Sequence, residues 1–321
     1  MKNHNFRLTT AQLAQICGVS QGTVDRALNG RAEIRPETRA RILRVAAEYG
    51  YRPDPTGARM IGVLVFDLEN AYFSGLITEL ERCAQTTDAS VIVMLSHKDP
   101  VRERQCLERL YRTGADGIVL CPIRTGAEYT AYLRSFHVPV VTVGNRLDGI
   151  PHVGIDDFAA MTDVTRHVCG HGYDRLIYVS PKLPTDPSIN ADAPIARYRA
   201  FCAAARRPYT VVDSPEAVPD ALEPGVRNAV ICATDDYALS LWQLSRARGF
   251  GLTGFDGLTL LDRMRIPLDT VVADRAVAAQ GVLNALTQPN PRGVTVPHRL
   301  IVRGSVESPH ENTRGCAPVN G

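Results

Sequence analysis

The sequence has no long apolar run. Its first ten residues, MKNHNFRLTT, lack the apolar core of a signal peptide, and no later stretch approaches the roughly 20 apolar residues that a membrane-spanning helix needs. These absences argue against a secreted protein and against an integral membrane protein. We expect a cytoplasmic protein that has no membrane partner.

Paired cysteines are also missing. The eight cysteines are scattered singly, and none belongs to a C-x-x-C motif. Most fall in apolar helix or strand patterns, where a free thiol behaves as a small buried hydrophobic group. His167 and His171 stand at helical spacing, but Gly170 and Gly172 interrupt that helix. We therefore expect reduced cysteines and no metal site.

Motifs of reactive sites are scarce. The sequence contains neither G-x-S-x-G nor the phosphate-binding G-x-x-x-x-G-K-[ST]. One G-x-G-x-x-G occurs at Gly249–Gly254, between an expected helix and an expected strand. Dinucleotide binding needs the order strand, glycines, helix. We expect no catalytic residue and no cofactor.

Charge is unevenly divided along the chain. Residues 1–60 contain ten Lys and Arg against five Asp and Glu, whereas residues 61–321 contain 26 against 29. Phosphate contacts need local positive charge, so only the N-terminal part is suited to a polyanion such as DNA. Hydrophobic residues make up 45% of the chain and charged residues 22%, which is typical of a globular protein with two or three compact units.

Residues 8–29, LTTAQLAQICGVSQGTVDRALN, predict two short helices joined by a tight turn. Thr9 or Thr10 is suited to cap the first helix, Gly18 to end it, and Ser20 to cap the second. The expected inner faces are Leu13, Ala14, Ile16 and Cys17, then Val24 and Leu28. This layout is that of a helix-turn-helix, whose second helix enters the DNA major groove. Two ordinary amphipathic helices remain the alternative.

The outward side of the second helix has the chemistry for reading bases. It carries Gln21, Gly22, Asp25 and Arg26, and the paired hydrogen-bonding groups of Gln and Arg match adenine and guanine edges. A third helix is predicted from Pro36 to about Tyr49. Its inner face is expected to be Ile42, Leu43, Val45 and Ala46, and the arginines at positions 35, 39, 41 and 44 add positive charge. We expect residues 1–53 to form a small DNA-binding domain.

Residues 54–60 are rich in turn formers and predict a short linker, after which β-branched runs alternate with amphipathic helices. Expected strands are Ile61–Phe66, Ser90–Leu95, Gly117–Leu120, Val140–Val143, Leu176–Val179, Tyr209–Val212, Ala229–Cys232, Leu252–Phe255 and Thr270–Val272. Expected helices are Tyr72–Thr86, Val101–Arg112, Glu128–Phe136, Phe158–Val168, Ala193–Ala205, Tyr237–Arg248 and Arg275–Leu286. The alternation predicts a doubly wound α/β body with parallel sheets in two lobes. Residues 307–321 lack apolar periodicity, and we expect them to be disordered.

Polar side chains follow the ends of the expected strands, where open α/β sheets bind ligands. The set comprises Asp67, Asn70, Tyr72, Asn145, Arg146, Asp156, Asp157, Thr234, Asp235 and Asp256, with Arg197 on a following helix. Carboxylate, amide and guanidinium groups beside an aromatic ring suit a polyhydroxylated ligand such as a sugar. The alternative is that Asp and Asn stand at these places as helix caps and turn formers.

The stretch from Leu8 to Pro53 resembles the DNA-binding head of the lactose-repressor/galactose-repressor family. VSQGTVDRALN, PETRARI and YGYRP carry that likeness, and IGVLVFDLENAYFSGL, VPVVTVGNR, GHGYDRLIYVS, ATDDYAL and LTGFDGL extend it along the body. The resemblance implies a homodimeric transcription regulator, a repressor, whose body has the two-lobed fold of periplasmic sugar-binding proteins. A small carbohydrate-like effector would close the lobes and change the affinity for operator DNA, with half-sites about one helical turn apart.

The resemblance also assigns roles. It gives Gln21, Gly22 and Arg26 to base reading and Ser20, Thr23 and Asn29 to phosphate contacts, and we add Thr9 and Arg35 to the expected DNA contacts. The implied effector contacts are Asp67, Asn70, Tyr72, Arg146, Asp156, Arg197, Thr234, Asp235, Asp256 and Asp274. The implied effector and dimerisation domain is residues 61–306, with one lobe at about 61–156 plus 274–290 and the other at about 157–273.

Departures from the family pattern leave alternatives open. Gly22 has no side chain where many members read a base, and the linker 54–60 is shorter than the usual hinge. One alternative is a metabolite-binding module that has lost specific DNA binding. Another is a sugar-metabolising enzyme with a fused DNA-binding head, against which the missing catalytic motifs count.

Overall fold

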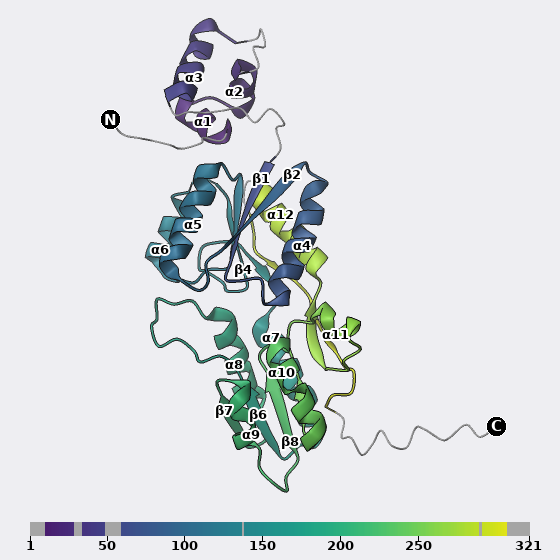
Figure 1. Ribbon diagram of the computed structural model, residues 1–321. Helices are drawn as coiled ribbons and strands as arrows, with labels where there is room; N and C mark the ends of the chain where they lie inside the picture. The colour runs from purple at the N-terminus through teal and green to yellow at the C-terminus, as the bar shows by residue number, and fades with distance from the viewer. Residues whose placement is uncertain (1–9, 29–33, 49–58, 137, 289–290, 307–321) are drawn as a thin grey trace, which may run out of the picture. The chain divides into compact units, whose positions relative to one another are not determined.

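The computed structural model describes residues 10–28, 34–48, 59–136, 138–288 and 291–306. Its first described part consists of three helices, α1 (Thr10–Cys17), α2 (Gln21–Leu28) and α3 (Pro36–Glu48) (Figure 1). A small core holds them together, made of Leu13, Ala14, Cys17, Val24, Ala27, Ile42 and Ala46. The predicted helix-turn-helix and third helix are therefore present.

The turn between α1 and α2 forms as the sequence predicts. Gly18 adopts φ 59°, the left-handed conformation that lets the chain leave α1, and the Val19 N–H donates to the Ala14 carbonyl. Ser20 Oγ then accepts from the Thr23 N–H at 3.2 Å as the cap of α2. Two expected core positions were wrong, because Ile16 is 46% exposed and Leu43 is 41% exposed.

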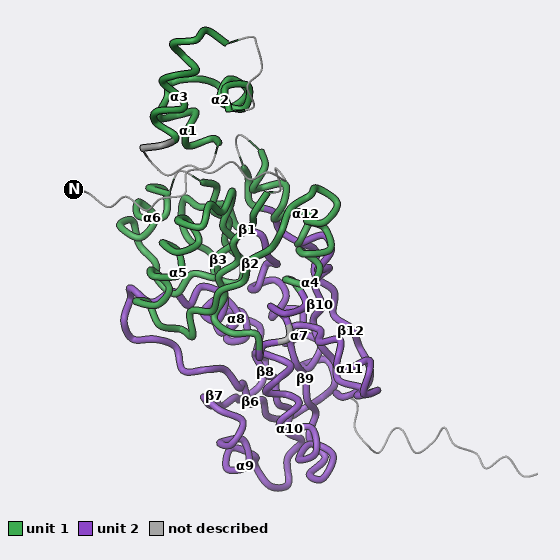
Figure 2. Tube along the Cα trace, turned by 45° about the horizontal axis from the view of Figure 1, so that its top comes forward, with its two compact units in different colours: residues 1–68, 76–152, 279–293 green, residues 69–75, 153–278, 294–321 purple. Residues whose placement is uncertain are grey.

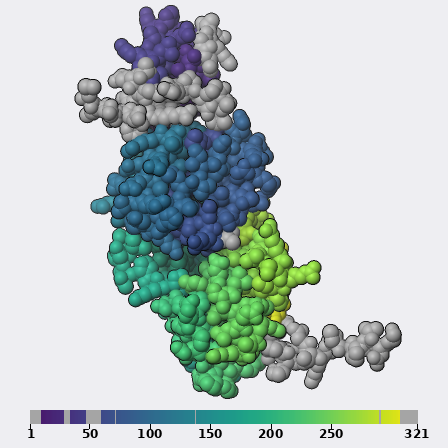
Figure 3. All heavy atoms as spheres, viewed as in Figure 1, coloured from purple at the N-terminus to yellow at the C-terminus, as the bar shows by residue number. Residues whose placement is uncertain are grey.

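The chain divides into two compact units, drawn in green and purple in Figure 2. Unit 1 comprises residues 1–68, 76–152 and 279–293, and unit 2 comprises residues 69–75, 153–278 and 294–321. Figure 3 draws the same chain as spheres, and the atoms of residues 59–136 appear there in blue. No helix in the described ranges has the length and apolar composition to cross a bilayer.

The sheet that begins in unit 1 has the strand order β11-β5-β4-β3-β1-β2, and β1–β2, β1–β3, β3–β4 and β5–β11 pair in parallel. The strands are β1 (Arg59–Val65), β2 (Ala89–Leu95), β3 (Gly117–Leu120), β4 (Val140–Val143), β5 (His152–Gly154) and β11 (Val294–Thr295). Helices α5 (Pro100–Thr113) and α6 (Ala127–Arg134) cover one face, and α4 (Ala71–Gln85) and α12 (Arg275–Thr287) lie on the other (Figure 1). β1 begins at Arg59, two residues inside the segment expected as linker.

Unit 2 contains a four-stranded parallel sheet of order β7-β6-β8-β9. Its strands are β6 (Arg175–Val179), β7 (Tyr209–Val212), β8 (Asn228–Cys232) and β9 (Gly251–Thr253). One core cluster joins this sheet to α7 (Asp157–Gly170) and α8 (Asp192–Ala204), and a second joins it to α9 (Val218–Ala221) and α10 (Asp235–Arg248). A one-turn helix, Pro215–Ala217, precedes α9, and α11 (Thr259–Arg263) follows β9.

A two-stranded antiparallel sheet completes unit 2, formed by β10 (Thr270–Ala273) and β12 (His298–Ile301). Asp269, which is fully buried, fastens the segment after β12. Its Oδ1 accepts from the N–H groups of Arg303, Gly304 and Ser305, and its Oδ2 lies 2.8 Å from His167 Nε2. These hydrogen bonds hold the pKa of Asp269 below its ordinary value, although burial acts the other way.

The predicted strands and helices of the body are all present, within a few residues of the expected ends. The doubly wound α/β prediction is thus confirmed. Six short elements were not predicted, namely β5, the turn at Pro215–Ala217, α9, α11, β11 and β12. The tail 307–321 lies outside the described residues.

Candidate functional site

The first turn of α2 presents polar groups to solvent. Ser20, Gln21, Gly22 and Asp25 are exposed, while Val24 is fully buried beneath them. The Ser20 and Thr23 hydroxyls lie 2.9 Å apart, so Thr23 is tied to the cap. The arrangement leaves the Gln21 side chain and the bare backbone at Gly22 as the most accessible groups of this turn.

Arginines surround this turn. Arg26 is half-buried on α2, and Arg35 is exposed just before α3. Arg39 of α3 donates from Nε to the Ala27 carbonyl at 3.2 Å, so it satisfies the C-terminal end of α2. Thr9 and Asn29, two predicted DNA contacts, lie outside the described residues.

The two parallel sheets each have a topological switch point. In unit 1, β2 and β3 lie on opposite sides of β1. In unit 2, β7 and β8 lie on opposite sides of β6. Ligands of doubly wound folds bind at the carboxyl ends of the strands that flank such a point. The rule points to Asp67 and Cys121 in unit 1, and to Ser180 and Ala233 in unit 2.

In unit 2 this place is occupied by Arg197 of α8. Its Nε donates to Asp157 Oδ1 at 2.7 Å, and its Nη1 donates to the Ala233 carbonyl at 2.7 Å and lies 3.7 Å from Asp256 Oδ1. The guanidinium carbon stands 3.8 Å from the centre of the Phe255 ring, so one face of the cation is covered. Nη2 donates to none of the described residues, which leaves it able to bind a ligand.

Asp256 is the second uncommitted group. Its side chain is only 7% exposed, yet its carboxylate accepts no hydrogen bond from the described residues. Its φ of 115° is rare for a residue with a side chain, and strain of this kind concentrates at functional sites. A ligand hydroxyl could supply the hydrogen bond that this carboxyl lacks.

The charges of this cluster compensate one another. Burial raises the pKa of Asp256 to about 8, with further raising by the charges of Asp235, Asp236 and Asp157 and lowering by Arg197. The Arg197 cation is matched by the Asp157 anion, whose Oδ1 lies 2.7 Å from Arg197 Nε. Arg197 Nη2 and the Asp256 carboxyl are the two groups of this cluster that make no hydrogen bond to the described residues.

Four predicted effector contacts are helix caps in the structure. Asn70 Oδ1 accepts from the Tyr72 N–H, Asp156 Oδ1 from the Ala159 N–H, and Thr234 Oγ1 from the Tyr237 N–H. Asp274 Oδ1 accepts from the N–H groups of Ala276 and Val277 at the start of α12. The cap alternative thus accounts for the position of each, and an effector role for them stays a prediction.

Asp235, another predicted effector contact, is engaged with other residues of unit 2. It is fully buried, Oδ1 accepts from the Thr270 hydroxyl at 2.6 Å, and Oδ2 accepts from the Leu258 N–H at 2.8 Å. A Cβ on Gly254 would lie 2.1 Å from Oδ1, so glycine is needed there. Asp235 thus supports the turn that carries Asp256, and an effector role for it stays a prediction.

In unit 1 the switch point holds Asp67 next to buried Cys121. Burial, with smaller contributions from the Glu103 and Asp67 charges, raises the pKa of the Cys121 thiol to about 12, so this cysteine stays protonated. Arg146, exposed after β4, helps to lower the pKa of His152 to about 4, although burial is the main cause. Tyr72 stacks edge-to-face on Phe73, with ring centres 5.5 Å apart.

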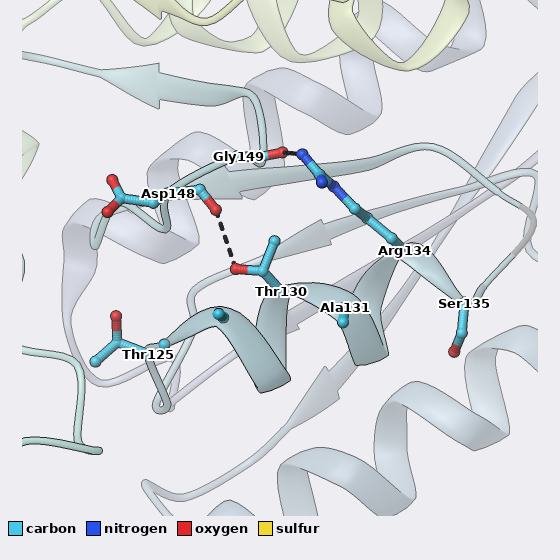
Figure 4. A pocket seen from close by; sticks show the side chains of 9 residues that line it. Thr125, Thr130, Ala131, Arg134, Ser135, Asp148 and Gly149 are labelled. Carbon is cyan, nitrogen blue, oxygen red and sulfur yellow. Dashed lines mark hydrogen bonds between the residues drawn. The ribbon is translucent and has the colours of Figure 1, made fainter.

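Cavities also open in the described chain beside other residues. One of about 710 Å³ lies over α6, where the Thr130 hydroxyl donates to the Asp148 carbonyl and Arg134 donates to the Gly149 carbonyl (Figure 4). Its polar side chains already hold the 148–149 loop, and no predicted site residue lines it. Another, of about 530 Å³, is lined by residues that include Ser180 and Asp213, after β6 and β7, and Tyr198 of α8.

Sequence reasoning missed three contributors to the unit 2 cluster. Asp157 stands beside Asp156 among the strand-end residues but is not one of the implied effector contacts, and Phe255 reads as a core strand residue. The Ala233 carbonyl gives no signal in the side-chain sequence. Only the pairing of α8 with the end of β8 brings these groups to Arg197.

Two family models match the chain. Residues 58–282 match the model described as periplasmic binding proteins and sugar binding domain of LacI family, and residues 11–54 match the model of bacterial regulatory proteins, lacI family. The chain belongs to the LacI family.

Relatives in the LacI family match along nearly the whole chain. Catabolite control protein A of Priestia megaterium is 25% identical over 334 aligned positions, covering 94% of this chain and all of the relative. The regulator PtxS of Pseudomonas aeruginosa is 26% identical, covering 93% and 96%. Both are transcriptional regulators, which sets aside the alternative of a sugar-metabolising enzyme. The chain is a DNA-binding transcriptional regulator of the sugar-responsive LacI type.

Solved structures agree on the fold. The lac repressor dimer bound to operator and the anti-inducer ONPF has a TM-score of 0.65 at 17% identity and covers 94% of this chain and 99% of its own. The CelR–cellobiose complex has a TM-score of 0.62 at 20% identity, with coverage of 92% and 99%. At these identities the likeness concerns the fold, a helical head followed by an α/β body.

Proposed function

We propose that this chain is a cytoplasmic homodimeric repressor that reads operator DNA with α2 and binds a neutral sugar at Arg197 and Asp256. The observation that carries the ligand part is the uncommitted Asp256 carboxyl beside the free Nη2 of Arg197. These two groups can accept from and donate to neighbouring hydroxyls of one sugar ring. The domain boundaries and the remaining predicted site residues are retained as part of this proposal, with Asp235 in a supporting place.

The DNA-reading surface follows from exposure on α2. Gln21 is the exposed side chain with paired donor and acceptor groups, and Arg26 is the nearby guanidinium on the same helix. At Gly22 the backbone itself can approach the base edges, so the operator is expected to differ from those of members with a side chain there. Ser20, Thr23 and Arg35 would position the helix on the phosphates.

The chain's own charges favour a ligand that is uncharged where unit 2 holds it. Asp157 lies 2.7 Å from Arg197 and already matches its charge, so a carboxylate or phosphate would meet no surplus positive charge. A neutral hydroxyl pair needs no surplus positive charge and satisfies both open groups. Neutral sugars are therefore the expected effectors, ahead of sugar acids and sugar phosphates.

The DNA part is tested by selecting bound sequences from a random duplex pool with the full chain at fixed salt. A palindrome with two half-sites is expected. Salt-sensitive binding with no sequence preference would contradict base reading by α2 and would favour a chain that only binds metabolite.

The ligand part is tested by thermal shift against paired probes: D-glucose, D-galactose, D-ribose and cellobiose, then D-gluconate, D-galactonate and glucose 6-phosphate. A neutral probe is expected to raise the melting temperature, since a ligand that binds only the folded state stabilises it. Asp157→Asn leaves the Arg197 cation unmatched and should let a sugar acid bind. Asp163→Asn, an exposed change on the same helix, is the control. A wild-type preference for an anionic probe would contradict the neutral class.

A further inference from the structure

Arg275, the first residue of α12, grips the turn that carries Asp256. Its Nη2 donates to the main-chain oxygens of Asp256 at 3.3 Å and Gly257 at 2.9 Å, and its Nη1 donates to Thr259 Oγ1 at 3.2 Å. No carboxylate among the described residues lies within ion-pair distance, and the buried Nε has no hydrogen-bond partner there. The guanidinium is thus engaged with the backbone of the turn that carries Asp256.

Gly75 of α4 closes the other side of this guanidinium. A Cβ on Gly75 would lie 3.0 Å from Arg275 Nε, 3.1 Å from Cδ and 3.3 Å from Cζ. The side chain therefore packs on bare helix backbone with no slack between them. We call this set of contacts the clamp. It lies within unit 2, to which all its residues belong: Gly75, Asp256, Gly257, Thr259 and Arg275.

The two helices that meet this clamp are the ones in which the boundary between the units falls. Residues 71–75 of α4 and 275–278 of α12 belong to unit 2, and the rest of each helix belongs to unit 1. A helix transmits a displacement of its first turn along its axis because its hydrogen bonds keep it stiff. A displacement of Arg275 and Gly75 would accordingly reach residues 76–85 of α4 and 279–287 of α12, which belong to unit 1.

We infer that Arg275 is a positioning residue that passes sugar contact at Asp256 to α4 and α12. The inference rests on the proposed function, in which the sugar binds Asp256. A ligand that reorients the Asp256–Gly257 backbone must break both carbonyl bonds to Arg275 or carry the guanidinium with it. Because the guanidinium lies against Gly75, the second course moves the first turns of both helices together.

Two variants separate this role from simple stabilisation. Arg275→Lys keeps the charge but cannot reach both carbonyls and the Thr259 hydroxyl at once. Gly75→Ala keeps Arg275 and puts a methyl group against it, while alanine by itself favours the helix. If Arg275 only stabilised the fold, Gly75→Ala would leave the effect of sugar on DNA affinity unchanged. Arg263→Lys, an exposed change at the end of α11, is the matched control.

The readout is the ratio of DNA affinities with and without sugar, using the full chain, the duplex recovered from the random pool and the neutral probe that shifts the wild type most. Typical allosteric ratios are about 5- to 150-fold. We expect the ratio to approach 1 in Arg275→Lys and Gly75→Ala while calorimetry still detects the probe. The two changes should not add, because each breaks the same contact.

The outcomes distinguish the inference from the proposed function. If the wild type shows no ratio with any probe, the proposed function fails and the inference falls with it. If the wild type and Arg263→Lys respond and both clamp variants respond equally well, Arg275 is not a positioning residue. If Arg275→Lys fails to fold, Gly75→Ala alone decides, and a normal response in that variant overturns the inference.

Discussion

Glu103 is held entirely out of water in unit 1. Its Oε1 accepts from the Tyr129 hydroxyl at 2.6 Å and its Oε2 accepts from the Ile123 N–H at 2.8 Å, so one carboxyl joins α5, the loop after β3, and α6. Burial raises the pKa of Glu103 from 4.5 to about 7, against the lowering effect of both hydrogen bonds. The loop it holds begins at Cys121, where the switch point of unit 1 lies.

This raised pKa makes stability depend on pH. Between pH 4.5 and 7 the folded chain keeps a proton on Glu103 that the unfolded chain releases, so the free energy of unfolding falls as pH rises. The loss amounts to about 3 kcal/mol. Glu103→Gln should remove this slope while keeping the shape, as urea unfolding at several pH values would measure. Glu128→Gln, exposed on α6, should keep it, and an unchanged slope in Glu103→Gln would refute the assignment.

At the scale of elements, hydrophobic patterning predicted the helices and strands that bury an apolar face along their length. Strands such as β8 and helices such as α7 bury a repeating apolar face, and the sequence shows it. β5, β11 and β12 have two to four residues and lack the run of β-branched residues that marks equally short strands such as β4, and β12 pairs with β10 only through a distant antiparallel contact. Their positions are decided by tertiary contacts that no local pattern records.

The site was predictable to the same extent. The sequence indicates which polar residues follow the strands, but it cannot tell Asp256, whose carboxyl makes no hydrogen bond to the described residues, from Asp235, which is fully engaged. Both are aspartates that follow a buried apolar run. The difference arises from Thr270 and Leu258, which reach Asp235 from other elements, and from Arg197, which reaches Asp256 from α8.

The segment after β12 depends on Asp269, and this gives a prediction for that element. Asp269→Ala leaves the N–H groups of residues 303–305 without their acceptor and should lower the free energy of unfolding by about 3–5 kcal/mol. Hydrogen exchange at these three amides should rise together with the loss measured in urea. Asp163→Ala breaks the exposed contact with His298 and should cost less than about 1 kcal/mol. Equal losses in both variants would contradict a special role for Asp269.

At the scale of the whole molecule, the part of the chain expected to bind DNA and the part expected to bind ligand carry opposite net charges. The excess of Lys and Arg is confined to residues 1–60, and residues 61–321 carry a small excess of acid. Phosphates should therefore attract the heads and repel the bodies, which favours binding in which two heads reach DNA and the bodies stay clear of it.

A dimer of this kind fixes the spacing of its operator. Adding about 5 base pairs between the half-sites turns one of them to the opposite face of the duplex, and affinity should fall towards that of a single half-site. A second insertion of the same length should restore part of the affinity. Gel shifts on the three duplexes measure this, and equal affinity for all three would show that the heads bind independently.

Gly75 has a consequence for attempts to improve this protein. Replacing a glycine inside a 15-residue helix with alanine gains about 1 kcal/mol of helix stability, so a search for heat-resistant variants would include Gly75→Ala, although its Cβ would lie 3.0 Å from Arg275 Nε. If this variant folds, it should still bind operator and sugar, while the promoter no longer responds to the sugar. Selection for heat resistance alone would thus yield a regulator that no longer responds to its effector.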